Sequence, residues 1–455
     1  MRPLDRHALA TLGAAAIVAV AAAAVGDRVG LQVVSVTPAR GAGQVSTLAT
    51  IEIRFSEPVA PAARSSALAV EPHVDGSMRW GSRTLRFDPD RALSARTRYT
   101  VRLDGSVRAA SGRRLRGPVE WSFDTGALRI AYVADGAAER SRIAARVVVT
   151  GEGDGSAPGR PEAGGERTLA SFERPVRDFH QSPDGGSLVV TLGTDVFAAD
   201  LWLVDATGDR RELLGCGGAE CSAARWAPDG ATIVFSRRRL PLPPRPWLLD
   251  PVTGDLWPLV EEEVIGFDPR WSDDGAWVAF VSPVEGGLRI VNVADGRTVL
   301  VPTRAAAPGA WRPGAREILS SDLREEAGGR FADTLISIDL ADLTVRRALG
   351  PEQGPDRAPA WAPDGGRFAF IRAADDGEQV WLATDAGGPY FDAAPLVAAP
   401  GLTYRQIVFA PGGDLLAAQR SRLDVPFPEP EVVVLDLSGR ELAVIAGATT
   451  PRWLP

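Results

Sequence analysis

The chain has 455 residues, of which 45% are hydrophobic and 24% charged, so it can bury a sizeable core. Its formal net charge of −8 excludes a nucleic-acid binder that relies on a basic surface. The chain contains no lysine, so its 50 cationic Lys-or-Arg positions are all arginine, and it contains three histidines. These counts exclude Schiff-base lysine chemistry, a phosphate-loop lysine and any site that needs several histidine ligands.

Residues 1–29 have the pattern of a membrane anchor or export signal. Arg2 and Arg6 precede an uncharged apolar stretch from Ala8 to Gly26. As a helix this stretch would rise about 28 Å, close to the thickness of the hydrocarbon layer. Basic residues ahead of it favour an amino end in the cytoplasm and the rest of the chain outside. We therefore expect one transmembrane helix, with a cleaved signal peptide as the alternative because Ala22–Ala24 supplies small residues.

Residues 30–126 are predicted to form an antiparallel β-sandwich. Apolar alternations such as IEIRF (51–55) and RYTVRL (98–103) recur between turns rich in Pro, Gly and Asp. The succession of TPARGAGQV, IEIRFSEPV, LRFDPDRALSARTRYTVRL and the closing WSFDTG resembles the bacterial Ig-like domain of S-layer and cell-surface proteins. That resemblance implies a spacer or adhesive module rather than a catalytic domain.

Residues 127–455 contain a repeated turn in which an aromatic residue stands two positions before a proline. Good copies are RWAPDG at Trp226 and AWAPDG at Trp361, and degenerate copies run from Gln181 to Trp453 at intervals of 40 to 50 residues. An apolar run follows each turn and is expected to be the inner strand of its unit. Four strands in about 40–50 residues form one blade of a β-propeller.

The two ends of this segment are predicted to share one sheet. The chain ends at Trp453–Pro455, where an inner strand should follow, and a strand of that kind stands at the other end as LRIAYVADG (128–136). Joining the two completes a blade and leaves no open edge strand. We expect seven blades of about 47 residues, with six blades as the alternative.

The W-x-P-D-G turn followed by an apolar strand resembles the WD-repeat-like β-propeller of TolB and related envelope proteins. Each turn residue then has a structural role: Pro fixes φ, Asp accepts hydrogen bonds from the turn backbone, Gly adopts positive φ and Trp packs between blades. The expected fold class is all-β, with an Ig-like sandwich followed by a β-propeller.

Cys216 and Cys221 are the two cysteines of the chain, in the loop GCGGAEC. In an exported protein such a close pair can form a small disulfide that closes the loop. Two ligands without a neighbouring histidine argue against zinc.

The chain lacks the motifs of familiar enzymes. A propeller-linked serine hydrolase requires G-x-S-x-G and a catalytic histidine, but that motif is absent and His180 is the one histidine of residues 127–455. The acidic residues select no catalytic pair. We therefore expect no catalytic residue, no metal site and no cofactor.

The residue just before the repeated aromatic is basic in four repeats: His180, Arg225, Arg270 and Arg452. Equivalent positions of a propeller lie on a ring about its axis. We expect these side chains to converge near one mouth of the channel and to attract an anionic group. The alternative is that arginine fills a solvated strand position in a chain without lysine.

The segment RRRLPLPPRPW (237–247) has the composition of a polyproline ligand. It makes Arg238, Leu240, Pro241 and Pro244 candidate partner contacts. A surface loop between the first and second strands of one blade is the simpler alternative.

These features predict a non-enzymatic binding or scaffold protein outside the cytoplasm, held at the membrane by its amino-terminal segment, or secreted or periplasmic if that segment is cleaved. The propeller would present a face or channel mouth to a protein, a peptide or a glycan, and nucleic acid is not expected as a partner. The alternatives are a glycan hydrolase or lyase that uses channel carboxylates, and a structural component of a surface layer.

Overall fold

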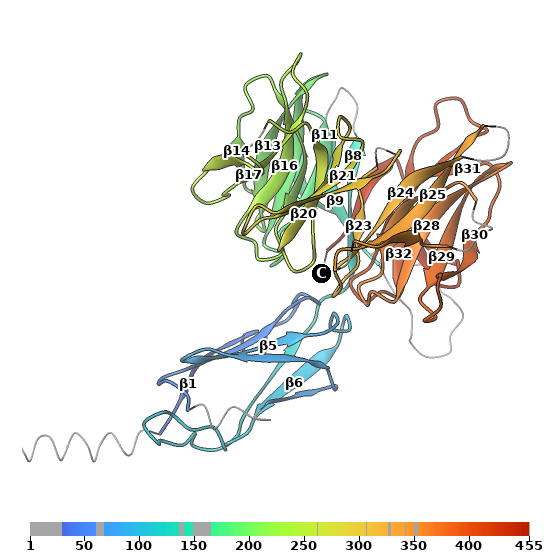
Figure 1. Ribbon diagram of the computed structural model, residues 1–455. Helices are drawn as coiled ribbons and strands as arrows, with labels where there is room; N and C mark the ends of the chain where they lie inside the picture. Colours follow the sequence, from blue (N-terminus) through green and yellow to red (C-terminus); the bar gives the residue numbers. More distant parts are fainter. Residues whose placement is uncertain are drawn as a thin grey trace, which may run out of the picture. The chain divides into compact units, whose positions relative to one another are not determined.

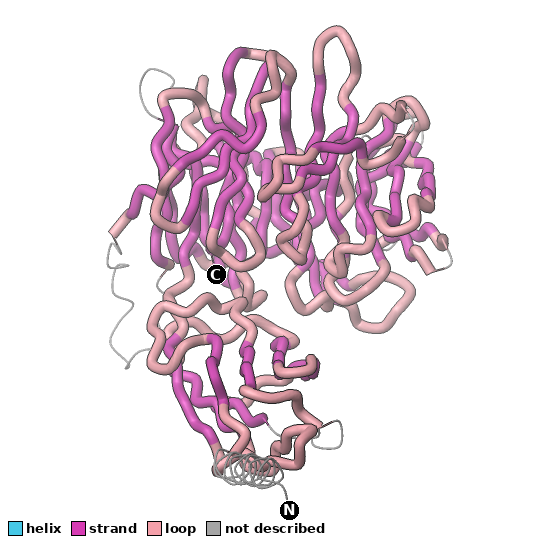
Figure 2. The backbone as a smooth tube through the Cα atoms, turned by 90° about the vertical axis from the view of Figure 1, so that its left-hand side faces the viewer, coloured by secondary structure: helices cyan, strands magenta, loops and turns pink. Residues whose placement is uncertain are grey.

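The computed structural model describes residues 30–60, 68–135, 141–148, 165–261, 263–305, 307–325, 329–341, 343–349 and 354–454. These residues form strands and loops without a helix (Figure 2). The chain divides into two compact units, with the boundary between Gly126 and Ala127. The predicted anchor over residues 1–29 lies outside the described residues, and within them no helix has the length and apolarity to cross a membrane.

The first unit is a sandwich of two antiparallel sheets. One sheet has the order β1 (Val33–Thr37), β2 (Ile51–Phe55), β5 (Thr84–Pro89), β4 (Gly76–Trp80). The other has the order β3 (Leu68–Glu71), β6 (Arg98–Leu103), β7 (Val119–Asp124).

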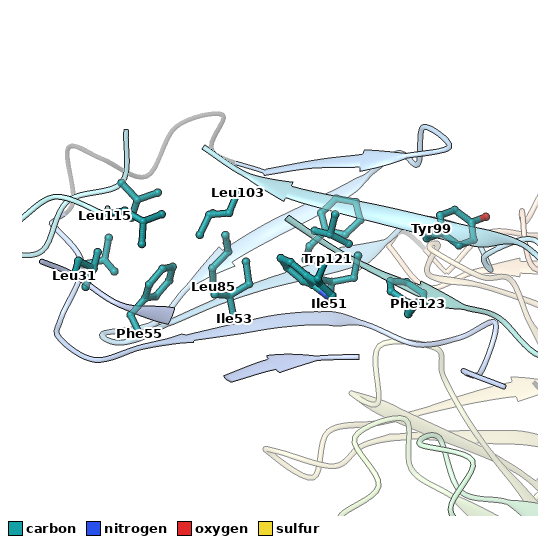
Figure 3. Close-up of a cluster of buried hydrophobic side chains, with 14 of the residues drawn as sticks. Leu31, Ile51, Ile53, Phe55, Leu85, Tyr99, Leu103, Leu115, Trp121 and Phe123 are labelled. Atoms are coloured by element: carbon teal, nitrogen blue, oxygen red, sulfur yellow. The ribbon is translucent and has the colours of Figure 1, made fainter. Parts of the chain in front are cut away.

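The core of this unit follows from period-two alternation along the strands. Ile51, Ile53 and Phe55 of β2 are at most 1% exposed, whereas the intervening residues face away from the core. They pack with Trp121 and Phe123 of the opposite sheet (Figure 3). The indole of Trp121 donates to the carbonyl of Pro38 at 3.2 Å, so its polar atom is satisfied inside the core. These side chains explain why the segment folds as a sandwich.

The second unit contains, within its described residues, seven four-stranded antiparallel sheets, two of which are joined by one parallel pair, Ala199 with Glu220 (Figure 1). We number them in chain order from the sheet that holds β8. Their strands, starting with the one that lines the central cavity described below, are sheet 1, β35 (Ala448–Leu454), β8 (Arg129–Asp135), β9 (Ser141–Val147), β10 (Arg167–Phe172); sheet 2, β11 (Val176–Gln181), β12 (Ser187–Asp195), β13 (Ala198–Asp205), β14 (Arg210–Leu214); sheet 3, β15 (Glu220–Trp226), β16 (Ile233–Arg238), β17 (Arg245–Leu249), β18 (Leu256–Pro258); sheet 4, β19 (Phe267–Trp271), β20 (Trp277–Ser282), β21 (Gly287–Asn292), β22 (Thr298–Pro302); sheet 5, β23 (Ala310–Trp311), β24 (Glu317–Glu325), β25 (Phe331–Asp339), β26 (Val345–Arg347); sheet 6, β27 (Asp356–Trp361), β28 (Arg367–Ala374), β29 (Gly377–Thr384), β30 (Asp392–Val397); sheet 7, β31 (Leu402–Phe409), β32 (Leu415–Arg422), β33 (Glu431–Asp436), β34 (Glu441–Ala446).

The two ends of the second unit share sheet 1, as the sequence predicted. β35 pairs antiparallel with β8, and Trp453 stands opposite Ile130. The assignment of the inner strand was wrong, however. The strand that ends at the repeated aromatic lines the cavity, and the apolar run after the turn is the second strand of its sheet. The aromatic strand takes the inner place because its residues before the aromatic are small or charged and suit a solvated channel.

The repeated turns have the predicted chemistry. Asp274 accepts hydrogen bonds from the hydroxyl of Ser272 at 2.6 Å and from the backbone N–H of Ala276 at 3.0 Å. Gly230 and Gly365 adopt positive φ of 73° and 65°, which side chains rarely tolerate. These turns therefore fix how each inner strand passes into the next strand.

The repeated tryptophans link neighbouring sheets through their indole N–H groups. Trp271 donates to the carbonyl of Arg225 at 3.3 Å, and Trp311 donates to the carbonyl of Arg270 at 3.1 Å. Trp361 and Trp453 make the same contact with the preceding sheet, at 3.1 and 3.2 Å. In each case the acceptor is the residue just before the repeated aromatic. The indoles thus hold the backbone of the positions that carry the predicted basic ring.

Candidate functional site

Bulges in the inner strands determine which side chains face the axis. In four of these strands the residue three positions before the aromatic has a positive φ of 52° or 53°: Ala223, Asp268, Ala358 and Thr450. In sheet 3, Ser222 stands opposite Ser236 and Arg225 opposite Val234, so three steps on the inner strand match two on its neighbour. Side chains two pairs apart face the same side of a sheet. The bulge therefore turns the residues one and four positions before the aromatic toward the same side.

The inner strands and the segments next to them surround a cavity of about 1,070 Å³. Residues of all seven sheets or of their connections contribute to its lining. Among the described residues, the lining includes four aspartates, Asp178, Asp268, Asp273 and Asp333, and seven arginines, Arg177, Arg225, Arg270, Arg304, Arg357, Arg405 and Arg452. The cavity therefore carries three more positive than negative formal charges in a protein whose net charge is −8.

The structure brings the predicted basic residues together, but as an arc rather than a ring. Arg452, His180, Arg225 and Arg270 come from sheets 1, 2, 3 and 4 in turn. The three arginines line the cavity, and we call them the arginine arc. His180 lies outside the lining, and its Nδ1 is buried without a partner in the part of the chain that the structure describes.

Two carboxylates serve the three guanidinium groups of the arc. Asp178 accepts from Arg225 at 2.6 Å through one oxygen and from Arg452 at 3.1 Å through the other. Asp268 pairs with Arg270 at 2.8 Å. The side chains of Arg225 and Arg452 are 9% and 15% exposed, so these groups are only slightly hydrated. One positive charge of the arc is left without a carboxylate of its own.

The pKa shifts follow from this crowding of charge. Burial alone raises the pKa of Asp178, but the charges of Arg225 and Arg452 outweigh it and hold the pKa below the ordinary value. Burial, with the charges of Arg225 and Arg270, lowers the pKa of Arg452 to about 10. Burial and the same arginine charges lower the pKa of His180 well below 6.5. Near pH 7 the arc is therefore charged and His180 is neutral.

Sequence reasoning missed four arginines of the lining, which we call the outer arginines: Arg177, Arg304, Arg357 and Arg405. Arg177 pairs with Glu220 at 3.1 Å, and Arg357 pairs with Glu378 at 2.5 Å. Three of the four stand four positions before the repeated aromatic, and that shared position is the signal that could have found them.

The proline-rich loop lies apart from the cavity. It connects the second and third strands of sheet 3, not the first and second as predicted, because β15 is the inner strand. Arg238 pairs with Glu220 at 2.5 Å, and Leu240 is 54% exposed. Pro241 follows a cis peptide bond and is exposed, whereas Pro244 is half-buried and its carbonyl accepts from Gly266 at 2.9 Å. The partner contact assigned to this loop stays a prediction.

Cys216 and Cys221 form the expected disulfide, with their Cα atoms 6.3 Å apart. Both are fully buried between β14 and β15, and the backbone N–H of Cys216 donates to Asp200 at 2.8 Å. Disulfides persist mainly in oxidising compartments outside the cytoplasm. Over the described ranges, no group of three or more His, Cys, Asp or Glu side chains is placed to hold a metal ion.

Comparison with known proteins agrees with both units. Residues 27–125 match the family model of the bacterial Ig-like domain. The chain is 31% identical over 133 residues to a protein TolB homolog of Chlorobium luteolum, a match that covers 28% of this chain and 29% of that protein. The chain therefore spans less than a third of the length of that relative.

Two solved structures show the same kind of fold at low sequence identity. TolB from Acinetobacter baumannii has 14% identity and a TM-score of 0.45, over 87% of this chain and 84% of the other. Oligogalacturonate lyase from Vibrio parahaemolyticus has 13% identity and a TM-score of 0.48, over 70% of this chain and 84% of the other.

The chain thus combines a bacterial Ig-like domain with a TolB-like β-propeller region. The likeness to TolB proteins and the disulfide both indicate an extracytoplasmic location.

Proposed function

We propose that this is a non-enzymatic binding protein of the cell envelope whose propeller channel receives an anionic group of a protein, peptide or glycan partner. The observation that carries the proposal is the arginine arc, in which Arg225, Arg270 and Arg452 share two carboxylates at the wall of a large cavity. A poorly hydrated charge without a full partner is costly, and an anion bound there would remove that cost.

The arc is also held ready for a ligand. Trp271 and Trp311 fix the backbone carbonyls of Arg225 and Arg270. Arg452 donates from Nε to the carbonyl of Phe179 at 3.2 Å in addition to its contact with Asp178. Side chains that are ordered before binding lose less conformational entropy when the ligand arrives. This preorganisation favours a binding role for the arc.

The state of Asp178 supports binding over glycan cleavage. A glycosidase needs one carboxylic acid whose pKa is raised so that it can protonate the leaving group. The pKa of Asp178 moves in the opposite direction because Arg225 and Arg452 stabilise its charge. This carboxylate is therefore suited to positioning the arginines and not to donating a proton.

The test is capture of partners from the cell envelope of the source bacterium. The full-length protein is compared with the Arg225→Gln/Arg270→Gln variant and with Arg440→Gln, which removes an exposed arginine paired with Asp436 on an outer turn. We expect the double variant to lose partners that the wild type and the Arg440→Gln variant both retain. Identical partner sets for all three proteins would contradict the proposal.

A further inference from the structure

The cavity places positive charge at two levels along the channel. The arginine arc occupies the position just before the aromatic, and Arg357 stands four positions before it in sheet 6. Arg357 pairs with Ile371 and Ala360 with Ala369, so these two levels are two strand pairs apart. Arg405 lies in the bulge between the pairs Tyr404–Arg420 and Gln406–Gln419, slightly farther from the aromatic. At about 3.4 Å per residue, the levels are roughly 7–10 Å apart.

Two of the outer arginines are available to a ligand. Arg405 is exposed and has no carboxylate partner among the described residues. Arg304 is also exposed, and its guanidinium lies over the ring of Phe331 at 5.5 Å, a contact that leaves its edge N–H groups open. In contrast, Arg177 and Arg357 are already paired with glutamates. The second level therefore offers two cations that no carboxylate of the described chain neutralises.

The part of the wall that sheets 5 to 7 form between these levels is apolar. Where sheets 1, 3 and 4 carry the arc, these sheets carry Ala310, Ala360 and Val408. The lining there continues with small or apolar residues, Ala307, Pro308, Gly309, Ala358, Pro359 and Ile407. Such a wall cannot hydrogen-bond the hydroxyl groups of a sugar chain, and burying them unpaired is costly. It does suit the apolar side chains of a peptide.

We infer that the channel binds an extended peptide segment with two acidic side chains two or three residues apart and apolar residues between them. One carboxylate meets the arginine arc and the other meets Arg304 and Arg405, while the apolar side chains contact the wall of sheets 5 to 7. In an extended peptide, two to three residues span about 7–10 Å, which equals the distance between the levels. The cavity volume of about 1,070 Å³ is larger than a single small anion requires. This inference rests on the proposed function and specifies its ligand.

The test uses isomeric peptides that differ only in the spacing of their acids. Fluorescein-labelled Glu-Val-Val-Glu and Glu-Val-Glu-Val are compared with Glu-Glu-Val-Val, all amidated, by fluorescence anisotropy on the full-length protein at low ionic strength. We expect a spaced peptide to bind at least about fivefold more tightly than the adjacent isomer, because only it reaches both levels. The Arg304→Gln/Arg405→Gln variant should reduce the affinity for the spaced peptide to that for the adjacent isomer. Arg440→Gln should change neither affinity.

The outcomes separate this inference from the proposed function. If the isomers bind equally and both lose affinity in the Arg225→Gln/Arg270→Gln variant, the channel binds anions but the spaced acidic peptide is wrong. If oligogalacturonate displaces the peptides at equal or lower concentration than the unlabelled spaced peptide, a glycan is the better ligand and the inference is overturned. If no peptide binds and partner capture is insensitive to the arc, both proposals are wrong.

Discussion

Asp178→Asn removes the carboxylate that Arg225 and Arg452 share. Its two oxygens accept at 2.6 and 3.1 Å, and its side chain is 19% exposed. The neutral amide preserves the shape but leaves three guanidinium groups with one carboxylate, Asp268. If the arc is an anion site with a carboxylate of the chain as its internal counter-ion, this variant should be unstable and should regain stability when an external anion binds.

The size of the effect follows from the burial of the pair. Removing one partner of a buried ion pair costs about 3–5 kcal/mol. Since Asp178 keeps some exposure and lines a solvated cavity, we expect the lower end, about 3 kcal/mol. At roughly 2 °C per kcal/mol, that lowers the Tm by about 6 °C. Sulfate at about 100 times its Kd would return about 2.7 kcal/mol, which is most of the loss.

Thermal melts in sulfate and in chloride at equal ionic strength measure both effects. Sulfate also stabilises proteins in general, so the wild type and Asp424→Asn are measured alongside. Asp424 pairs with Arg422 at the surface, where both side chains are more than half exposed. We expect sulfate to raise the Tm of the Asp178→Asn variant several degrees more than that of either control. An unchanged Tm, or an equal response to sulfate in all three proteins, would refute this reasoning.

Three further predictions concern His180, the indole contacts and the disulfide. The pKa of His180 is lowered below its ordinary 6.5, so the unfolded chain binds the proton more readily; stability should fall as pH drops below about 6.5, and His180→Gln should flatten thermal melts between pH 5 and 6.5. Trp311→Phe removes the indole donor to Arg270 and should cost about 1 kcal/mol of unfolding free energy and weaken anion binding, whereas Trp226→Phe, whose Nε1 has no partner in the described chain, should cost less in the same denaturation assay. Replacing both cysteines by serine should lower stability by about 2 kcal/mol, and equal melts for the two proteins would show that the loop closure contributes nothing.

Much of the fold could be predicted because its determinants are local and repeated. Period-two alternation marked the sandwich strands, as the burial of Ile51, Ile53 and Phe55 illustrates. The repeated aromatic turn located the sheets of the second unit, and the strand left over at each end predicted their closure through β35 and β8. These signals depend on neighbouring residues in the chain, so one sequence contains them.

The site was harder to predict because it depends on bulges and on contacts between sheets. Ala223 and Thr450 adopt positive φ although neither is glycine, and nothing in their type announces a bulge. Without the bulge, the position of Arg357 does not point into the channel. The pairing of Asp178 with Arg225 and Arg452 joins three sheets, and no spacing in the sequence encodes it. The predicted ring therefore became an arc only when the order of the sheets was known.

The most direct test of the central claim is to locate a bound anion in the channel. Crystals of the full-length protein are soaked in selenate, and the anomalous signal of selenium is mapped for the wild type and for the Arg225→Gln/Arg270→Gln variant. We predict a peak within hydrogen-bond distance of the guanidinium groups of Arg225, Arg270 and Arg452 in the wild type, and its loss in the variant. Selenate bound only on the outer surface, with the channel accessible to solvent, would contradict the account.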